Sequence, residues 1–202
     1  MSRAQATREK IIRLAAELFN QQGYSGASMS DLMRATGLQK GGIYNHFKSK
    51  DDLALEAFDF AIQQTKAHIL RSLEDKQGAI ARLQALVENY RDYWNNPPIS
   101  GGCPLLNTAV DSDDAHPALR SRAQTAMDEW RSLIRQIVQQ GITAGEISSA
   151  VDADGVATIM IATIEGGIMM SKLYGDRIHL ERALDHLDWY IENQLVMDGE
   201  RI

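Results

Sequence analysis

The chain of 202 residues has one cysteine, Cys103, and four prolines. A single cysteine excludes an internal disulfide and indicates a reducing compartment, so we expect a cytoplasmic protein. Three of the prolines, Pro97, Pro98 and Pro104, lie close together and interrupt the chain in one place. So few helix breakers, with many alanine, leucine and glutamine residues, are typical of a mostly helical protein.

Long hydrophobic runs are also missing. The first thirty residues are charged throughout and lack the apolar core of a signal peptide. The longest apolar stretch, 156–170, contains Glu165 and is shorter than the roughly 20 residues that cross a bilayer. We therefore expect no membrane partner and interpret this stretch as a buried core helix.

Catalytic and metal-binding motifs are absent from the sequence. Its five histidines are scattered, and only His179 and His186, seven residues apart, could share a helix face. Two such ligands do not make a metal site. No Ser-His-Asp arrangement follows from the spacing, and there is no phosphate-binding P-loop. We expect neither an enzyme nor a cofactor, and a helical-bundle enzyme is the weakest of the alternatives.

Charge is distributed unevenly along the chain. The net charge of −6 combines +5 in residues 1–50 with −11 in the remainder. A basic segment attracts a polyanion that an acidic body would repel, so nucleic acid is a candidate partner. The alternative is that the basic residues form an ordinary solvated surface.

Apolar residues recur at three- and four-residue spacing along most of the chain, which predicts amphipathic helices. We find no alternating strand pattern and no internal repeat. The fold class that follows is all-α, with about nine helices. The expected helices span 8–22, 29–35, 39–46, about 50–73, 80–90, 105–110, 117–140, 153–174 and 178–196.

Helix ends are marked by capping residues. Gly23 stands where the first helix should end, and Ser28 with Asp31 has the spacing of a capping box. Pro117 is suited to the first turn of a helix. Gly78 indicates a break, and Gly141 with Gly145 should close the longest helix.

The segments 29–35 and 39–46, joined by a tight turn at Gly37, match a helix-turn-helix. Its two helices should pack on each other and on the first helix through apolar side chains. These are Leu32, Met33, Leu38, Ile43 and Phe47 on one side, and Leu14, Leu18 and Phe19 on the other.

Several polar side chains are then left outside that core, with the amide, imidazole and ammonium groups that suit a major-groove surface. They are Gln39, Lys40, Tyr44, Asn45 and His46. Gly41 and Gly42 are unfavourable inside a helix but allow DNA to approach its backbone. Lys48 and Lys50 could reach flanking phosphates. Read singly, each of these residues also fits an ordinary surface or loop.

Residues 8–54 resemble the DNA-binding domain of TetR-family repressors. The shared pattern is a glycine in the recognition helix, the run Tyr44-Asn45-His46-Phe47 and the helix start Lys50-Asp51-Asp52-Leu53. It covers about a quarter of the chain. The resemblance implies a homodimer whose two recognition helices enter successive major grooves of a palindromic operator. It divides the chain into a DNA-binding domain, 1–52, and an effector-binding and dimerisation domain, 53–202.

The resemblance also implies roles for single residues of the DNA-binding domain. Positions that contact the phosphate backbone correspond to Ser28, Ser30, Lys40, Gly41, Tyr44, His46 and Lys50. Base-facing positions correspond to Gln39, Gly42 and Asn45. Because Gly42 has no side chain, sequence reading should depend on Gln39, Tyr44 and Asn45.

In the family the middle helices enclose an effector pocket and the last two form the dimer. Methionine and aromatic side chains suit an adaptable apolar cavity, although plain core residues show the same pattern. Glu165 needs a partner such as Arg131 or a cationic ligand, unless it is solvated or at an interface. The candidate pocket residues are Tyr90, Trp94, Met127, Trp130, Met160, Ile164, Glu165 and Met169, together with Cys103 and Asn107.

Cys103 and Asn107 form a Gly-Cys-x-x-x-Asn pattern before a predicted helix. A helix N-terminus favours the reactive thiolate. The pattern resembles a subset of TetR-type repressors that respond to electrophiles, among them the N-ethylmaleimide reductase repressor. The function expected is a repressor released from DNA by a small-molecule effector or by modification of Cys103. The alternatives are a buried, unreactive Cys103 and an architectural DNA-binding protein that senses nothing.

Overall fold

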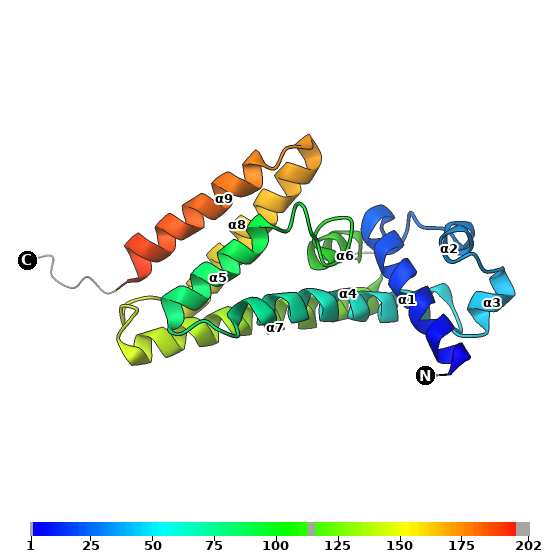
Figure 1. Ribbon diagram of the computed structural model, residues 1–202, viewed down its shortest axis with the longest axis horizontal. Helices are drawn as coiled ribbons and strands as arrows, with labels where there is room; N and C mark the ends of the chain where they lie inside the picture. The colour runs from blue at the N-terminus through cyan, green and yellow to red at the C-terminus, as the bar shows by residue number, and fades with distance from the viewer. Residues whose placement is uncertain (1, 113–115, 197–202) are drawn as a thin grey trace, which may run out of the picture. The chain divides into compact units, whose positions relative to one another are not determined.

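The computed structural model describes residues 2–112 and 116–196, which form helices joined by turns and loops (Figure 1). One isolated bridge, between Ile147 and Val196, is the only strand-like pairing among them. The all-α prediction is confirmed. The helices are α1 (Arg3–Gln22), α2 (Met29–Thr36), α3 (Lys40–Tyr44), α4 (Lys50–Leu73), α5 (Ala79–Arg91), α6 (Pro104–Ser112), α7 (Pro117–Ala144), α8 (Ala153–Tyr174) and α9 (Ile178–Tyr190), with a π-helical turn, η1 (Ile191–Leu195).

The chain forms two compact units. The first consists of Met1–Lys66 with Pro98–Ala126, and the second of Ala67–Pro97 with Met127–Ile202. The segment around α6 therefore groups with the N-terminal helices. The domain boundary expected after residue 52 stays a prediction.

Local sequence signals account for the helix ends of the first unit. Helix α1 ends at Gly23, whose φ is 75°. Ser28 and Asp31 form the predicted capping box in front of α2, and Gly37 closes α2 in the left-handed conformation with a φ of 72°. Only glycine adopts such angles at little cost, so these residues fix where the turns occur.

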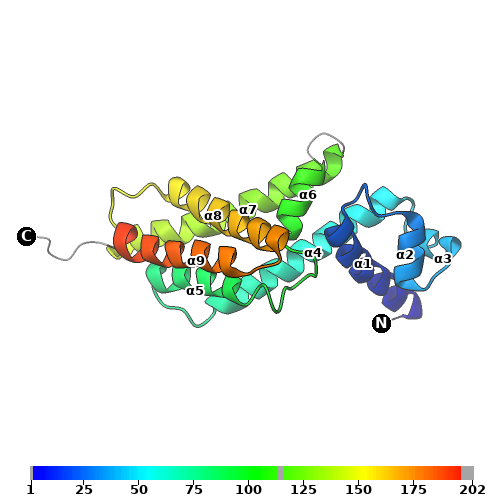
Figure 2. The ribbon, with the colours of Figure 1, turned by 90° about the horizontal axis from the view of Figure 1, so that it is seen from above.

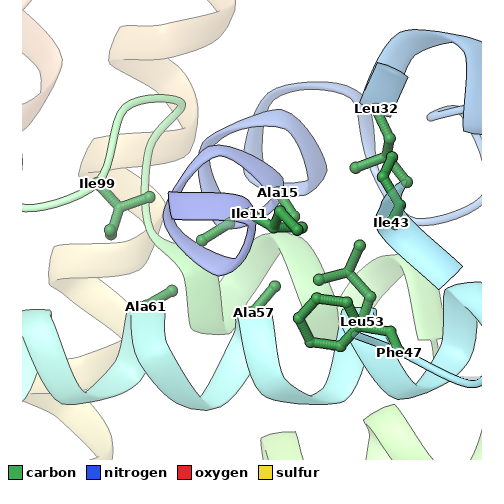
Figure 3. Close-up of a cluster of buried hydrophobic side chains, with 10 residues drawn as sticks. Ile11, Ala15, Leu32, Ile43, Phe47, Leu53, Ala57, Ala61 and Ile99 are labelled. Atoms are coloured by element: carbon green, nitrogen blue, oxygen red, sulfur yellow. The ribbon is translucent and has the colours of Figure 1, made fainter. Parts of the chain in front are cut away.

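The core of the first unit packs α1, α2, α3 and α4 around one apolar cluster (Figure 3). It contains Leu32, Ile43 and Phe47 as predicted, but Leu14 is not among its members. Figure 3 also shows Ile99, from the loop before α6, beside α1. Ile99 is buried in this cluster, which the sequence did not indicate.

In the second unit α8 and α9 run side by side as a hairpin, and α5 packs on α9 (Figure 2). Gly167 of α8 allows α8 and α9 to approach closely, since a Cβ at this position would lie 2.9 Å from the Cβ of Ala183 in α9. Ala157 is fully buried as well. Both small residues therefore serve packing within one protomer.

Several predicted helix ends differ from the structure, among them the start of the first helix, which lies at Arg3 and not at residue 8. Helix α7 continues through Gly141 to Ala144, and Gly145 follows it with a φ of 77°. Gly141 is needed instead for close packing, because a Cβ there would lie 2.5 Å from the Cβ of Ala79 in α5. The last helix ends at Tyr190, and η1 continues the chain to Leu195.

Glu146 caps the N-terminus of α5, although it lies far from α5 in the sequence. Its Oε2 accepts hydrogen bonds from the main-chain N–H groups of Ala79 at 2.7 Å and Ile80 at 3.4 Å. A carboxylate at a helix N-terminus satisfies free donors and complements the helix dipole. We expect Glu146→Gln to lower the free energy of unfolding by about 1–2 kcal/mol in urea denaturation. Glu181, a half-buried residue that pairs with Arg177 at 2.9 Å, is the control, and Glu181→Gln should cost less than about 0.5 kcal/mol. Equal effects of the two changes would contradict the capping role.

Candidate nucleic-acid interface

Helices α2 and α3, joined at Gly37, form a helix-turn-helix whose outer surface is polar. Gln39, Lys40, Gly41, Tyr44 and Asn45 are exposed on it, as are Ser30 and Lys48, whereas Gly42 and His46 are half-buried. The ammonium group of Lys40 lies 5.8 Å from the ring centroid of Tyr44. The structure thus brings most of the predicted DNA contacts onto one short segment.

Gly41 and Gly42 are not required by packing inside the protomer. A Cβ added at Gly41 would meet no atom within 4 Å, and one at Gly42 would make only an ordinary contact with Leu38. Neither residue has a positive φ. Each glycine nevertheless costs about 1 kcal/mol relative to alanine inside a helix. Packing within the protomer therefore does not account for either glycine.

Basic side chains of α1 connect the helix-turn-helix segment to α1 and α4. Arg8 donates to both carboxylate oxygens of Glu56 at 2.6 Å, and its guanidinium lies 4.9 Å from the ring centroid of Phe47. Lys10 donates to the main-chain oxygen of Thr36 at the end of α2, at 3.2 Å. Arg8, Lys10 and Lys50 all contribute to the positive charge of residues 1–50, and each of them has a partner within the protein.

Lys50 is engaged at the turn after α1. Its ammonium group donates to the main-chain oxygen of Tyr24 at 2.6 Å and lies 4.2 Å from that ring's centroid. The Tyr24 hydroxyl donates to Asp51. Burial raises the pKa of Tyr24 to about 12, with further contributions from that hydrogen bond and the charge of Asp51. These contacts fix the start of α4 against the end of α1.

Ser28 also has an internal partner. Its hydroxyl lies 2.5 Å from Asp31 Oδ2, and this hydrogen bond holds the pKa of the Asp31 carboxyl below its ordinary value. The phosphate contacts that the resemblance implies for Ser28 and Lys50 stay predictions. Each residue would share or exchange its present partner on binding DNA.

Most of the predicted pocket residues lie in the second unit. Tyr90, Met160, Ile164 and Glu165 are buried, and the ring of Tyr90 lies 6.0 Å from Trp130 and 5.5 Å from Tyr93 between centroids. Met127 is half-buried, whereas Trp94 and Met169 are exposed. Arg131, one of the partners suggested for Glu165, pairs with Asp154 at 2.7 Å, and a partner for Glu165 stays a prediction.

Cys103 and Asn107 lie in the first unit. Cys103 is 6% exposed and directly precedes α6. Asn107 lines a cavity of about 30 Å³ between α1, α4, α6 and α7, large enough for about one water molecule. The cavity walls are alanines of α1 and α4 on one side and Asn107, Thr108 and Asp111 on the other.

An apolar stripe follows the outer face of α8, at a spacing of three and four residues. We call it the α8 stripe; it consists of Ile159, Ala162, Gly166, Met169 and Leu173. Leu173 is 75% exposed, and a Cβ added at Gly166 would meet no atom within 4 Å. On α9, Trp189 is exposed as well and stacks on His186.

By length and composition alone, helix α8 is long and apolar enough to cross a membrane. Half of its most apolar 18-residue stretch is buried inside the protein. Core helices of soluble proteins have the same composition, so this is weak evidence for a membrane span. Over residues 2–112 and 116–196, no three His, Cys, Asp or Glu side chains gather as metal ligands.

Comparison with known proteins extends the likeness to the whole chain. Residues 11–57 match the family "Bacterial regulatory proteins, tetR family", and residues 79–187 match "Tetracyclin repressor-like, C-terminal domain". A TetR transcriptional regulator from Chloroflexus aurantiacus has a TM-score of 0.94 and 45% identity, covering 98% of this chain and all of that one. The HTH-type transcriptional regulator LmrA of Bacillus subtilis is 29% identical over 82% of this chain and 86% of its own.

A further solved relative contains a bound small molecule. A putative transcriptional regulator from Saccharomonospora viridis, in complex with choline, has a TM-score of 0.79 and 26% identity. The similarity covers 96% of this chain and 99% of that one.

Proposed function

Since the chain belongs to the TetR family of helix-turn-helix transcriptional regulators, a non-enzymatic family, we propose that it is a cytoplasmic, homodimeric repressor whose effector releases it from a palindromic operator. The observation that carries the DNA-binding part is the exposed polar surface of α3 with its two unexplained glycines. A recognition helix must let its backbone come close to the groove, and glycine permits that.

A second copy of the chain is the partner that best explains the α8 stripe. Ile159, Met169 and Leu173 would be costly to leave in water, since apolar patches on soluble proteins usually mark interfaces. Gly166 adds an independent argument, because its missing side chain gives a partner helix room to approach. Pairing of α8 and α9 between two protomers would then allow two DNA-binding domains to bind one operator.

An organic cation is the effector class that we propose. Tyr90, Tyr93 and Trp130 bring three aromatic rings together in the second unit, and aromatic faces attract quaternary ammonium groups. The related regulator from Saccharomonospora viridis holds choline. Glu165 is a buried carboxyl group on α8 in the same unit.

We expect choline to raise the melting temperature and weaken operator binding, as any ligand that prefers the released state must. Its neutral carbon analogue, 3,3-dimethylbutan-1-ol, should do neither. Equal responses to the two compounds, or no response to millimolar choline, would contradict a cation effector.

Modification of Cys103 is the alternative signal. Its position before α6 would favour a thiolate, but burial shields the sulfur from bulky reagents. We therefore expect reaction with thiol reagents to be slow and to follow local opening. A covalent adduct would not fit the closed packing and would displace α6.

The test of operator binding uses fluorescence anisotropy with a fragment from upstream of the gene, over a series of salt concentrations. Binding should weaken with salt, with a log–log slope of about −0.9 for each phosphate neutralised. Tyr44→Ala should reduce the affinity about tenfold, equivalent to ~1.4 kcal/mol, since it removes an exposed contact without disturbing the core. Leu70→Ala is the matched control, because Leu70 is 42% exposed and Tyr44 40%.

Equal affinity of the two variants would contradict the assigned surface. An architectural protein that senses nothing would also bind DNA in this assay. It would differ in that neither choline nor thiol reagents would change its affinity.

A further inference from the structure

Only part of the positive charge in residues 1–50 is available to bind a polyanion. Most of its basic side chains already contact a carboxylate or a main-chain oxygen of the protein, and such partners compete with phosphate. With their partners, these engaged side chains are Arg8 (Glu56), Lys10 (Thr36), Arg13 (Glu17), Arg34 (Asp31) and Lys50 (Tyr24). The remaining basic residues of the segment are Arg3, Lys40 and Lys48.

Arg3 differs from the other two because it lies outside the helix-turn-helix. Lys40 and Lys48 stand within or beside α3, where the sequence already predicts DNA contacts. Arg3 is exposed, and its guanidinium forms no ion pair or hydrogen bond with residues 2–112 or 116–196. A single free arginine on a surface is ordinary, so its position on α1 decides what it can reach.

The start of α1 extends beyond the part of the helix that supports α2 and α3. Lys10 donates to the main-chain oxygen of Thr36 at the end of α2, and Arg8 lies against the ring of Phe47, just after α3. Arg3 precedes Lys10 by seven residues, which places it on the same face of α1 and about 10 Å further along the helix axis. Both views show the first turn of α1 at the same end of the first unit as α3 (Figure 1 and Figure 2).

The first turn of α1 is helical although its side chains stand in solvent. Residues 2–6 are all exposed, and the Ser2 side chain caps the helix by accepting a hydrogen bond from the main-chain N–H of Gln5 at 3.2 Å. This turn contains no acidic residue, and a cation at a helix N-terminus opposes the helix dipole. Helix stability therefore does not explain Arg3, whereas the capped turn holds its backbone in a defined place.

We propose that Arg3 is a further DNA-binding residue, which binds a phosphate of the operator backbone beside the groove that α3 enters. This inference rests on the proposed DNA-binding function. Arginine suits such a contact because its planar guanidinium can donate two parallel hydrogen bonds to one phosphate. The contact adds affinity and orients the protein on the duplex, but it does not distinguish one base sequence from another.

The salt dependence of DNA binding provides the test, measured on the full-length protein by fluorescence anisotropy with the operator and with a scrambled duplex. Arg3→Gln removes two phosphate contacts from a dimer, so the log–log salt slope should become less steep by about 1.8. The affinity should fall by roughly 30-fold at 0.15 M salt, and by the same factor on both duplexes. Arg3→Lys keeps the charge and should restore most of the slope. Thermal unfolding of Arg3→Gln should occur at the wild-type temperature or above it, since the variant removes a cation from a helix N-terminus.

Arg13→Gln is the matched control. It removes the same charge from another exposed position of α1, but Arg13 pairs with Glu17, so the slope should stay that of the wild type. An Arg3→Gln slope equal to that of Arg13→Gln would overturn the proposal, and so would a loss of affinity confined to the operator. A wild type that binds neither duplex would remove the proposed function as well.

Discussion

Leu173→Asp should convert the proposed dimer into a monomer and lower operator affinity by at least about 100-fold, because two linked half-site contacts become one. Leu173 has the most exposed of the large side chains in the α8 stripe, at 75%, so an aspartate there should be solvated in the monomer and leave the protomer folded. Across a two-fold interface each such carboxylate would be desolvated in the apolar contact, and a buried charge without a partner is costly.

Val110→Asp is the matched control, since Val110 on α6 is 69% exposed but stands outside the stripe. Sedimentation velocity should give a dimer for the wild type and for this control, and a monomer for Leu173→Asp. A dimeric Leu173→Asp protein would show that the α8 stripe is not the interface.

Gly41→Leu should separate folding from DNA binding. The new side chain meets no atom of the protomer within 4 Å of its Cβ, and leucine replaces a residue that is about 1 kcal/mol less favourable in a helix. We therefore expect unchanged or higher stability in thermal unfolding. Operator affinity should fall by at least about 100-fold, ~2.7 kcal/mol, because the side chain occupies the space that DNA needs.

Gly41→Ala should show the same two effects in smaller measure. The stability measurement is the internal control, since a folding defect would lower both quantities together. Wild-type operator affinity in Gly41→Leu would mean that DNA does not approach α3 at this position.

Local signals were enough to predict most of the fold. The capping box at Ser28, the glycines at 23 and 37 and the proline at 117 each act within one turn, so the residues themselves state where a helix begins or ends. Gly141 misled the prediction because its role depends on the distance to Ala79 in α5, which the sequence does not contain.

The site was predicted less completely, for the same reason. Exposed residues such as Gln39 and Tyr44 follow from helical periodicity once the core is known. The internal partners of Lys50 and Asn107 do not, because they lie far away along the chain. Gly166 and Gly167 are neighbours in sequence, yet only the structure shows that Gly167 packs on α9 while Gly166 faces outward.

Selection of DNA from a pool of genomic fragments tests the central claim most directly. The wild-type protein should enrich fragments that contain two symmetry-related half-sites, and footprinting should place their centres one helical turn, about 34–36 Å, or a multiple of it apart. Gly41→Leu, which we expect to fold normally, should enrich none. No enrichment by the wild type, or equal enrichment by both proteins, would contradict the assignment of α3 as an operator-reading helix.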